Sequence, residues 1–276
     1  IRERIIMFEK VLETTQYLEN RVTNRPKIAI ILGSGLGGLV DYVENKVVIP
    51  YKEIPNFPVS TVAGHAGELV FGTINGVEVL VMKGRFHYYE GYNMKQVTYP
   101  QYVFKQFGIE TMIVSNAAGG ANKTFKPGTL MIINDHINFF GTSPLIGSND
   151  ERFGPRFPDM SETYNKGLIE KAKEVAGKLD IEYREGVYLG SSGPAYETAA
   201  EVTMMMRMGA DAVGMSTVPE SIVANYLGIK ILGISCITNM ATGIATKPHS
   251  HEEVVEIANQ TGEKFCKWIA ETVKEL

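Results

Sequence analysis

ELVFGTINGVEVLVM, residues 68–82, is the stretch that decides how the sheet of this chain is built. Two apolar runs rich in valine, isoleucine and phenylalanine flank the dipeptide Asn75-Gly76, and runs of this kind form β-strands. Asn-Gly is the dipeptide most typical of a two-residue hairpin turn. The two strands must therefore pair antiparallel, so the sequence predicts a sheet that is not purely parallel.

Further strand-like runs precede and follow the hairpin. They are KIAIIL (27–32), KVVIPY (46–51), TMIVSN (111–116), TLMIIND (129–135), EYREGVYL (182–189), DAVGM (211–215) and KILGISCIT (230–238). Helical periodicity lies between many of them, at 1–20, 93–107, 161–179, 197–209, 216–228 and 250–276. Strands that alternate with helices, without an internal repeat or a linker, predict one α/β domain over residues 1–276, with a mixed sheet and helices on both faces.

A glycine-rich loop follows the first strand in KIAIILGSGLGGL, residues 27–39. Gly33, Gly35 and Gly38 have the GxGxxG spacing of a dinucleotide-binding loop, and Glu53 stands about twenty residues on, where a ribose-binding acid would be wanted. However, the next strand begins too soon for a full crossover helix, and the hairpin beyond it interrupts the required helical connection. An NAD- or flavin-dependent oxidoreductase stays an alternative, and a loop that cradles a smaller anion is favoured.

The overall composition is that of a globular protein of 276 residues, 44% of them hydrophobic and 21% charged. A formal net charge of −4 argues against a nucleic-acid binder or a binder of acidic membranes, which would carry a basic stripe. No apolar run reaches the length of a membrane span, and the charged first residues do not form a secretory signal. Cys236 and Cys266 have no disulfide or metal spacing, so we expect a cytoplasmic enzyme.

Two segments carry groups suited to an anion. In GSGLGG the glycines allow close backbone approach and Ser34 offers a hydroxyl, although a simple tight turn would use the same glycines. In GRFHYYEGY, residues 84–92, Arg85 can grip an oxyanion through two parallel hydrogen bonds, His87 can add another, and Glu90 can fix the tautomer of His87. A solvated loop with scattered charges is the alternative for this second segment.

Other segments carry groups suited to a planar ring. In SNAAGGAN, residues 115–122, small residues expose main-chain N–H groups and leave a flat wall. Glu197 can accept hydrogen bonds from a bound base, or it can stabilise the dipole of the helix that follows. Asn239 comes after a strongly apolar strand, where a buried amide needs partners for its donor and its acceptor.

No metal site is expected. His249 and His251 form an HxH pair at a helix start, but no third ligand stands at a suitable spacing. Asp135 and His136 have no cluster around them, so we interpret both as structural.

Taken together, the motifs resemble the trimeric purine nucleoside phosphorylases, the low-molecular-mass class that acts on 6-oxopurine nucleosides. The matching segments, in family order, are GSGLGGL, TVAGHAGELVFG, GRFHYYEGY, SNAAGGAN, NDHIN, NDERFGPRFPDMS, GPAYETAAE, GADAVGMSTVPE, ITNMATGI and HEEV. No single motif decides the matter, but their combination is highly specific. The resemblance also implies that the mixed central sheet is barrel-like.

The resemblance implies three groups of site residues. For phosphate they are Ser34, His65, Arg85, His87, the main-chain N–H of Ala117, and Ser216. For the purine they are Ala117, Ala118, Gly119, Tyr196, Glu197, Val213, Met215, Thr238 and Asn239. For the ribose they are Tyr89, Met215 and His251, with Phe153 contributed by a neighbouring subunit.

The implied reaction is the reversible phosphorolysis of purine ribonucleosides and 2′-deoxyribonucleosides in purine salvage, with Asn239, Glu197 and His87 as the catalytic residues. Inorganic phosphate is then a co-substrate and no cofactor is expected. The implied partners are small-molecule substrates and two further copies of the chain. Tyr196 stands where the mammalian branch has phenylalanine, and His251 is placed mainly by the HEEV motif around it. A nucleoside hydrolase is a second alternative, but the clustered aspartates that would hold its calcium are missing from the sequence.

Overall fold

The computed structural model describes residues 2–59, 67–245 and 250–276, with side chains from Met7 onward. All nine strands in these residues belong to one sheet. The strands are β1 (Ile28–Leu32), β2 (Glu44–Pro50), β3 (Glu68–Ile74), β4 (Val77–Lys83), β5 (Thr111–Gly120), β6 (Leu130–Phe139), β7 (Tyr183–Ser191), β8 (Ala212–Gly214) and β9 (Lys230–Met240). Each strand overlaps a run predicted from the sequence.

The sheet consists of an open part and a closed part. Its order is β2-β3-β4-β1-β5-β8-β7-β6-β9, and β9 also pairs with β5, so the last five strands close into a ring. The hairpin of β3 and β4 is antiparallel with Ile74 opposite Val77, whereas β1 runs parallel to both β4 and β5. The predicted mixed, barrel-like sheet is confirmed, and β5 belongs to both of its parts.

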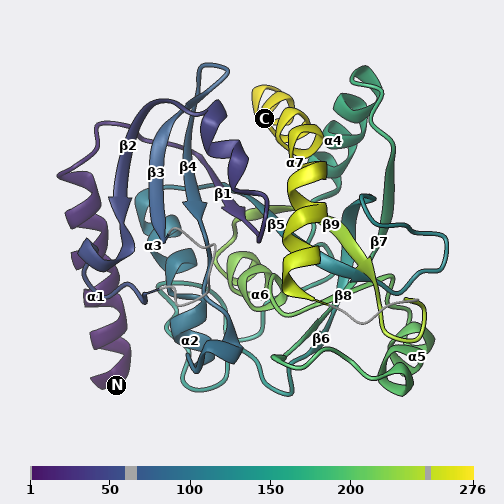
Figure 1. The fold of residues 1–276 in the computed structure, drawn as a ribbon. Coiled ribbons are helices and arrows are strands. Elements are labelled where there is room, and N and C mark those ends of the chain that lie inside the picture. Colours follow the sequence, from purple (N-terminus) through teal and green to yellow (C-terminus); the bar gives the residue numbers. More distant parts are fainter. Residues whose placement is uncertain (1, 60–66, 246–249) are drawn as a thin grey trace.

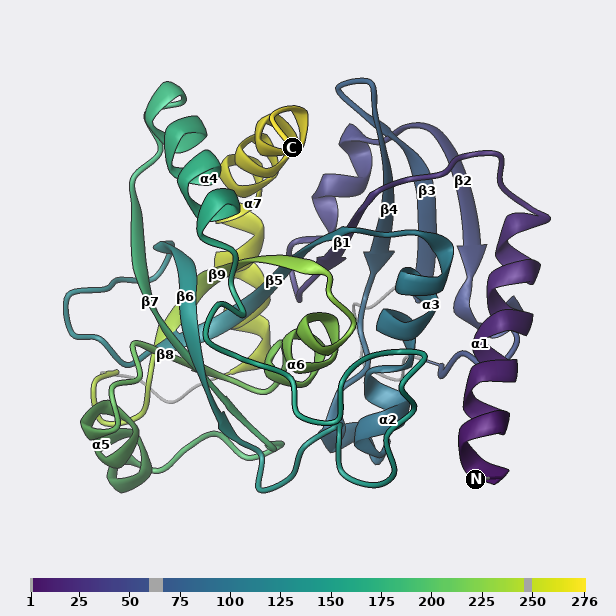
Figure 2. The ribbon, with the colours of Figure 1, turned by 180° about the vertical axis from the view of Figure 1, so that it is seen from behind.

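Helices cover both faces of this sheet. They are α1 (Arg2–Glu19), α2 (Met94–Val97), α3 (Tyr99–Phe107), α4 (Lys166–Lys178), α5 (Ala199–Arg207), α6 (Val218–Tyr226) and α7 (His251–Lys274). The long α7, yellow in Figure 1, crosses one face in front of β5 and β9. Figure 2 shows α3 and α6 in front of the opposite face. The predicted arrangement of helices on both sides is therefore confirmed.

The glycine-rich loop after β1 leads into a short 3-10 helix, Gly37–Tyr42, and then directly into β2. Because β2 pairs antiparallel with β3, this connection is not the α-helical crossover of a dinucleotide-binding unit. Gly33 is needed for another reason, since a Cβ there would stand 2.6 Å from the Cα of Asn116 on β5. The dinucleotide alternative is therefore wrong, and the glycine serves close packing of β1 against β5.

The core lies between the sheet and its helices. Trp268 of α7 is fully buried, and its indole N–H donates to the carbonyl of Ala172 in α4 at 2.8 Å. The central strands are buried along their length, with Ile30, Ile31 and Val114 at 0% exposure. Among the described residues, no helix is both long enough and apolar enough to cross a bilayer.

Candidate active site

A pocket of about 770 Å³, open to solvent at its mouth, gathers the residues that the sequence singled out. Its walls come from the loops after β1, β4, β7 and β8, from the ends of β5 and β9, and from the start of α7. Fifteen of the predicted site residues line it: Ser34, Arg85, His87, Tyr89, Ala117, Ala118, Gly119, Tyr196, Glu197, Val213, Met215, Ser216, Thr238, Asn239 and His251. His65 lies outside the described residues, and Phe153 lies elsewhere.

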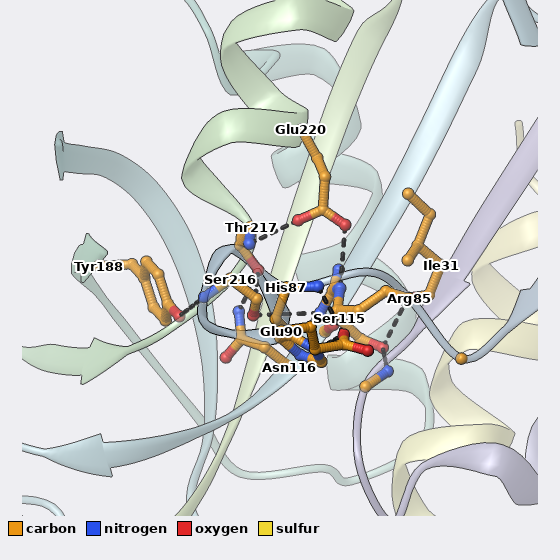
Figure 3. A network of polar contacts seen from close by, with 12 residues as sticks. Ile31, Arg85, His87, Glu90, Ser115, Asn116, Tyr188, Ser216, Thr217 and Glu220 are labelled. Atoms are coloured by element: carbon orange, nitrogen blue, oxygen red, sulfur yellow. Dashed lines mark hydrogen bonds and ion pairs between the residues drawn. The ribbon is translucent and has the colours of Figure 1, made fainter. Parts of the chain in front are cut away.

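Arg85 occupies the inner end of the pocket, directly after β4. Its side chain is 1% exposed, and its Nε–H donates to Oε1 of Glu220 at 2.9 Å. Its Nη1 donates to the carbonyl of Ser115 at 2.5 Å and to Oγ of Ser216 at 3.3 Å. These contacts join the loop after β4 to β5 and to the loop after β8 (Figure 3). A buried guanidinium held in this way can present its N–H groups to an anion without reorganising.

His87 is held by Glu90 from behind, as the sequence predicts. Oε1 of Glu90 accepts the backbone N–H of His87 at 2.8 Å and lies 3.0 Å from its Nδ1. The carboxylate fixes the ring with Nδ1 toward Glu90. Tyr89 stacks on the imidazole with ring centroids 4.7 Å apart. Burial raises the pKa of Tyr89 to about 12, so its hydroxyl keeps its proton and remains a hydrogen-bond donor.

The third wall of the inner end is a tight turn at Ser216-Thr217. The N–H of Val218 donates to the carbonyl of Ser216 at 2.7 Å, and Thr217 has φ 69° and ψ −49°, which is the geometry of a γ-turn. Asn116 of β5 donates from Nδ2 to Oγ1 of Thr217 at 2.9 Å. The turn thus carries the hydroxyl of Ser216 toward the guanidinium of Arg85.

The other end of the pocket has the groups suited to a base. Glu197 lies before the first turn of α5, and its Oε1 accepts from the hydroxyl of Ser191 at 3.0 Å. The acid in the first turn of α5 is Glu201, which forms a capping box with Thr198, whereas Glu197 precedes the helix. Oδ1 of Asn239 accepts from the hydroxyl of Thr238 at 2.9 Å.

Gly119 of β5 lies opposite Asn239 of β9 and leaves the wall between them flat. A Cβ at Gly119 would stand 3.4 Å from both Nδ2 of Asn239 and the side chain of Val213. The sequence predicted this wall as a loop after the strand, whereas the structure continues β5 through Gly120. The wall is therefore rigid sheet, held by pairing with β8 and β9.

His251 and Phe153 complete the placement of the predicted residues. His251 is the first residue of α7, whose N-cap Ser250 accepts from the backbone of Glu253 at 3.1 Å. Phe153 lines a second cavity, where its ring packs against Tyr102 with centroids 4.8 Å apart. Its predicted contact with a neighbouring subunit stays a prediction.

Sequence reasoning missed the residues that hold the predicted ones in place, namely Glu220 behind Arg85, Ser115 on β5 and Ser191 behind Glu197. A signal for Glu220 does exist, since Thr217 and Glu220 have the T-x-x-E spacing of a capping box at a helix start. Ser115 begins the SNAAGGAN motif, which stands out in the sequence for other reasons, and nothing in the local sequence marks Ser191. Within the part of the chain that the structure describes, no three His, Cys, Asp or Glu side chains gather as metal ligands would.

Comparison with known proteins gives a consistent result over almost the whole chain. The family model of the phosphorylase superfamily matches residues 27–274. Purine nucleoside phosphorylase 1 of Geobacillus stearothermophilus is 54% identical over 264 residues, which are 96% of each protein. The purine nucleoside phosphorylase of Rattus norvegicus is 45% identical over 275 residues, covering 97% of this chain and 95% of its own.

The solved structures agree with these relatives. A crystal structure of Schistosoma mansoni purine nucleoside phosphorylase in complex with inosine has a TM-score of 0.93 to this chain at 40% identity, and it covers 97% of this chain and 96% of that one. The sequence matches and the structural match both extend over nearly the whole chain. The chain therefore belongs to the phosphorylase superfamily, among its purine nucleoside phosphorylases.

Proposed function

We propose that this pocket catalyses the reversible phosphorolysis of inosine, guanosine and their 2′-deoxy forms. A purine nucleoside and inorganic phosphate give the free base and α-(deoxy)ribose 1-phosphate, a step of purine salvage that needs no further cofactor. One observation carries the proposal: a single pocket has hydrogen-bond donors fixed at its inner end and a carboxylate and an amide at its other end. Relatives with this fold have the same named activity.

The inner end is suited to hold phosphate beneath C1′ of the nucleoside. Arg85 and His87 are each positioned by a carboxylate, and Ser34, Ser216 and the N–H of Ala117 surround the same space. His65 is assigned to this group by resemblance alone. The bound dianion acts both as nucleophile and as counter-charge to the cationic ribosyl ring that forms when the glycosidic bond stretches. Holding it there removes much of the entropic cost of a two-substrate encounter.

The other end is suited to stabilise the leaving purine. As negative charge accumulates on the base, Asn239 hydrogen-bonds N7 and O6, and Glu197 accepts from N1–H and, in guanine, from the 2-amino group. Ala118, Gly119, Val213 and Thr238 form the walls around the ring, with Tyr196 at the rim. The ribose then lies between the two ends, against Tyr89, Met215 and His251.

This arrangement selects for 6-oxopurines. Adenine would place its N1 acceptor against the Glu197 carboxylate, and its 6-amino group is a donor where the oxo group is an acceptor. An unmatched buried polar contact costs about 1–3 kcal/mol, so inosine should be preferred over adenosine by about tens of fold or more.

The assembly that we propose is a homotrimer in which Phe153 of one subunit closes the ribose end of a neighbour's pocket. Phe153 lies outside the pocket of its own chain, which is consistent with a contact between its ring and the pocket of another copy. Cys236 and Cys266 are buried free thiols, as is typical of the reducing cytoplasm in which we place the enzyme.

The test is to incubate the purified protein with inosine, with and without inorganic phosphate, and to measure hypoxanthine and ribose 1-phosphate. We expect both products only when phosphate is present, in equal amounts. Hypoxanthine and free ribose formed without phosphate would identify a hydrolase and refute the proposal. Thymidine, which has a pyrimidine base, serves as the control substrate and should not react.

A further inference from the structure

We propose that Glu220 is the positioning residue of the phosphate site, because its carboxylate holds both Arg85 and the Ser216-Thr217 turn in place. The inference rests on the proposed function, since it assigns a role within the same pocket. Glu220 itself does not line the pocket, and its side chain is 3% exposed. It lies in the first turn of α6, behind the groups that would touch phosphate (Figure 3).

The two oxygens of Glu220 bind two different walls of the site. Oε1 accepts the Nε–H of Arg85 at 2.9 Å, and Oε2 accepts the backbone N–H of Thr217 at 2.6 Å. Arg85 follows β4 and Thr217 follows β8, so these two walls come from segments more than a hundred residues apart in sequence. One carboxylate therefore fixes the guanidinium relative to the hydroxyl of Ser216.

The turn at Thr217 needs such support. A β-branched residue at φ 69° is strained, and a γ-turn of this hand is rare in proteins. The strain persists only where the surroundings hold the backbone in place. The N–H of Thr217 is held by Glu220, and its hydroxyl is held by Asn116 at 2.9 Å. Releasing the first contact would let the turn relax and would move Ser216 away from Arg85.

Charge gives Glu220 a second effect on the anion. Arg85 and Glu220 form a buried ion pair, and a buried charge without its partner carries a large desolvation cost. With the carboxylate present, the guanidinium stays correctly oriented when the pocket is empty. Affinity for phosphate then depends on the geometry of the donors rather than on net positive charge.

The substitution Glu220→Gln tests this role sharply. Both partners of Glu220 are donors, whereas glutamine has one acceptor oxygen and an NH₂ group. The amide must therefore turn its NH₂ toward either Arg85 or Thr217 and lose one of the two contacts. Glu220→Asp keeps the charge and both acceptors on a side chain one methylene shorter, so it should recover part of what the glutamine loses.

Glu201→Gln is the matched control. Glu201 caps α5 in the same way, since its Oε2 accepts the N–H of Thr198 at 2.7 Å, but it has no arginine partner among its described contacts and does not line the pocket. Arg85→Ala is the positive reference, because loss of the guanidinium should raise the phosphate KM far more than the nucleoside KM.

The measurements are the KM for phosphate, the KM for inosine, and the Kd for inorganic phosphate by calorimetry on the free enzyme. For E220Q we expect the phosphate KM and Kd to rise about tenfold or more, as misplacement of a binding group commonly causes, with the inosine KM within about twofold of the parent. E220D should lie between the parent and E220Q, and E201Q should match the parent.

An unchanged phosphate Kd in E220Q, or an equal rise in both KM values, would overturn the role of Glu220. If E220Q does not fold, the same comparison with E220D decides the matter. Failure of the proposed function gives a different result, namely parent enzyme that cleaves inosine without phosphate. In that case the phosphate Kd of E220Q against that of the parent still tests the positioning role.

Discussion

The arginine and the histidine of the proposed phosphate site each have a carboxylate behind them. Arg85 is paired with Glu220, and His87 lies 3.0 Å from Glu90 through Nδ1. Both carboxylates are almost fully buried, with side-chain exposures of 3% for Glu220 and 2% for Glu90. Each fixes the direction in which its partner's remaining N–H groups point. At the scale of single residues, the inner end of the pocket is therefore preorganised.

Asn239 offers a test of base selectivity. Replacing it by aspartate substitutes a second acceptor for the amide donor, which suits the 6-amino group of adenine and opposes the 6-oxo group of hypoxanthine. For Asn239→Asp we expect the ratio of kcat/KM for adenosine to that for inosine to rise about tenfold, equivalent to one polar contact of about 1.4 kcal/mol. Steady-state kinetics on both nucleosides measures this ratio.

The charge-matched control is Asn45→Asp, since Asn45 is exposed on β2 and does not line the pocket. Its ratio should equal that of the parent. An unchanged ratio in Asn239→Asp would show that selectivity resides in other residues.

The sequence was sufficient to predict fifteen of the residues that line the pocket, because they stand in distinctive motifs that resemble those of a known family. Arg85, His87 and Asn239 all belong to such motifs. The supporting residues were not predicted, because their chemistry is ordinary and their partners are remote in sequence. Ser191 and Ser115 illustrate this, since each holds a site residue through a hydrogen bond that only the folded chain creates.

At the scale of elements, α4 contains in its last turn a glycine that the fold does not require. A Cβ at Gly177 would meet nothing within 4 Å, and this residue is exposed. Glycine within a helix costs about 0.5–1 kcal/mol relative to alanine, so Gly177→Ala should raise the free energy of unfolding by about that amount. Urea denaturation measures the change.

Gly33→Ala is the contrasting variant. Its Cβ would stand 2.6 Å from the Cα of Asn116, where only backbone could move away. We therefore expect a clear loss of stability in Gly33→Ala. A result in which both alanine variants shift stability in the same direction would contradict the argument from local space.

The elements themselves were largely predictable, because the apolar runs and turn signals are strong. The exception is the segment 93–107, which the periodicity predicts as one helix and the structure divides at Thr98 into α2 and α3. Pro100 explains the division, since its ring clashes with the carbonyl four residues earlier and its nitrogen has no hydrogen to donate. Closure of β9 onto β5 was not predictable from local patterns, because it depends on pairing between residues far apart in sequence.

At the scale of the whole molecule, buried tyrosine hydroxyls and cysteine thiols determine how the free energy of unfolding changes at alkaline pH. Burial raises the pKa of Tyr188 to about 12 and that of Cys236 to about 11, against ordinary values of 10.0 and 9.0. Unfolded chains release these protons at lower pH than the fold does, so above pH 9 the unfolded state binds fewer protons. The stability is thus fully present below that pH and is lost as pH rises through about 11 and 12.

Urea midpoints measured from about pH 8 to about pH 11 should therefore fall progressively. Cys236→Ala should make the decline shallower, whatever it does to stability at neutral pH. A midpoint that stays constant over this range would contradict the expectation.

The strand β5 is common to the open sheet and the closed ring, and it contributes to both ends of the pocket. Ser115 lies at the anion end and Gly119 at the base end, four residues apart on a continuous strand that rises about 3.3 Å per residue. The strand β5 thus contributes to the spacing between the proposed phosphate and purine ends of the pocket, together with the loops that carry Arg85 and Ser216. We therefore expect the pocket to discriminate between substrates by the length of the nucleoside. An analogue with a spacer atom between sugar and base would be too long to contact both ends of the pocket at once.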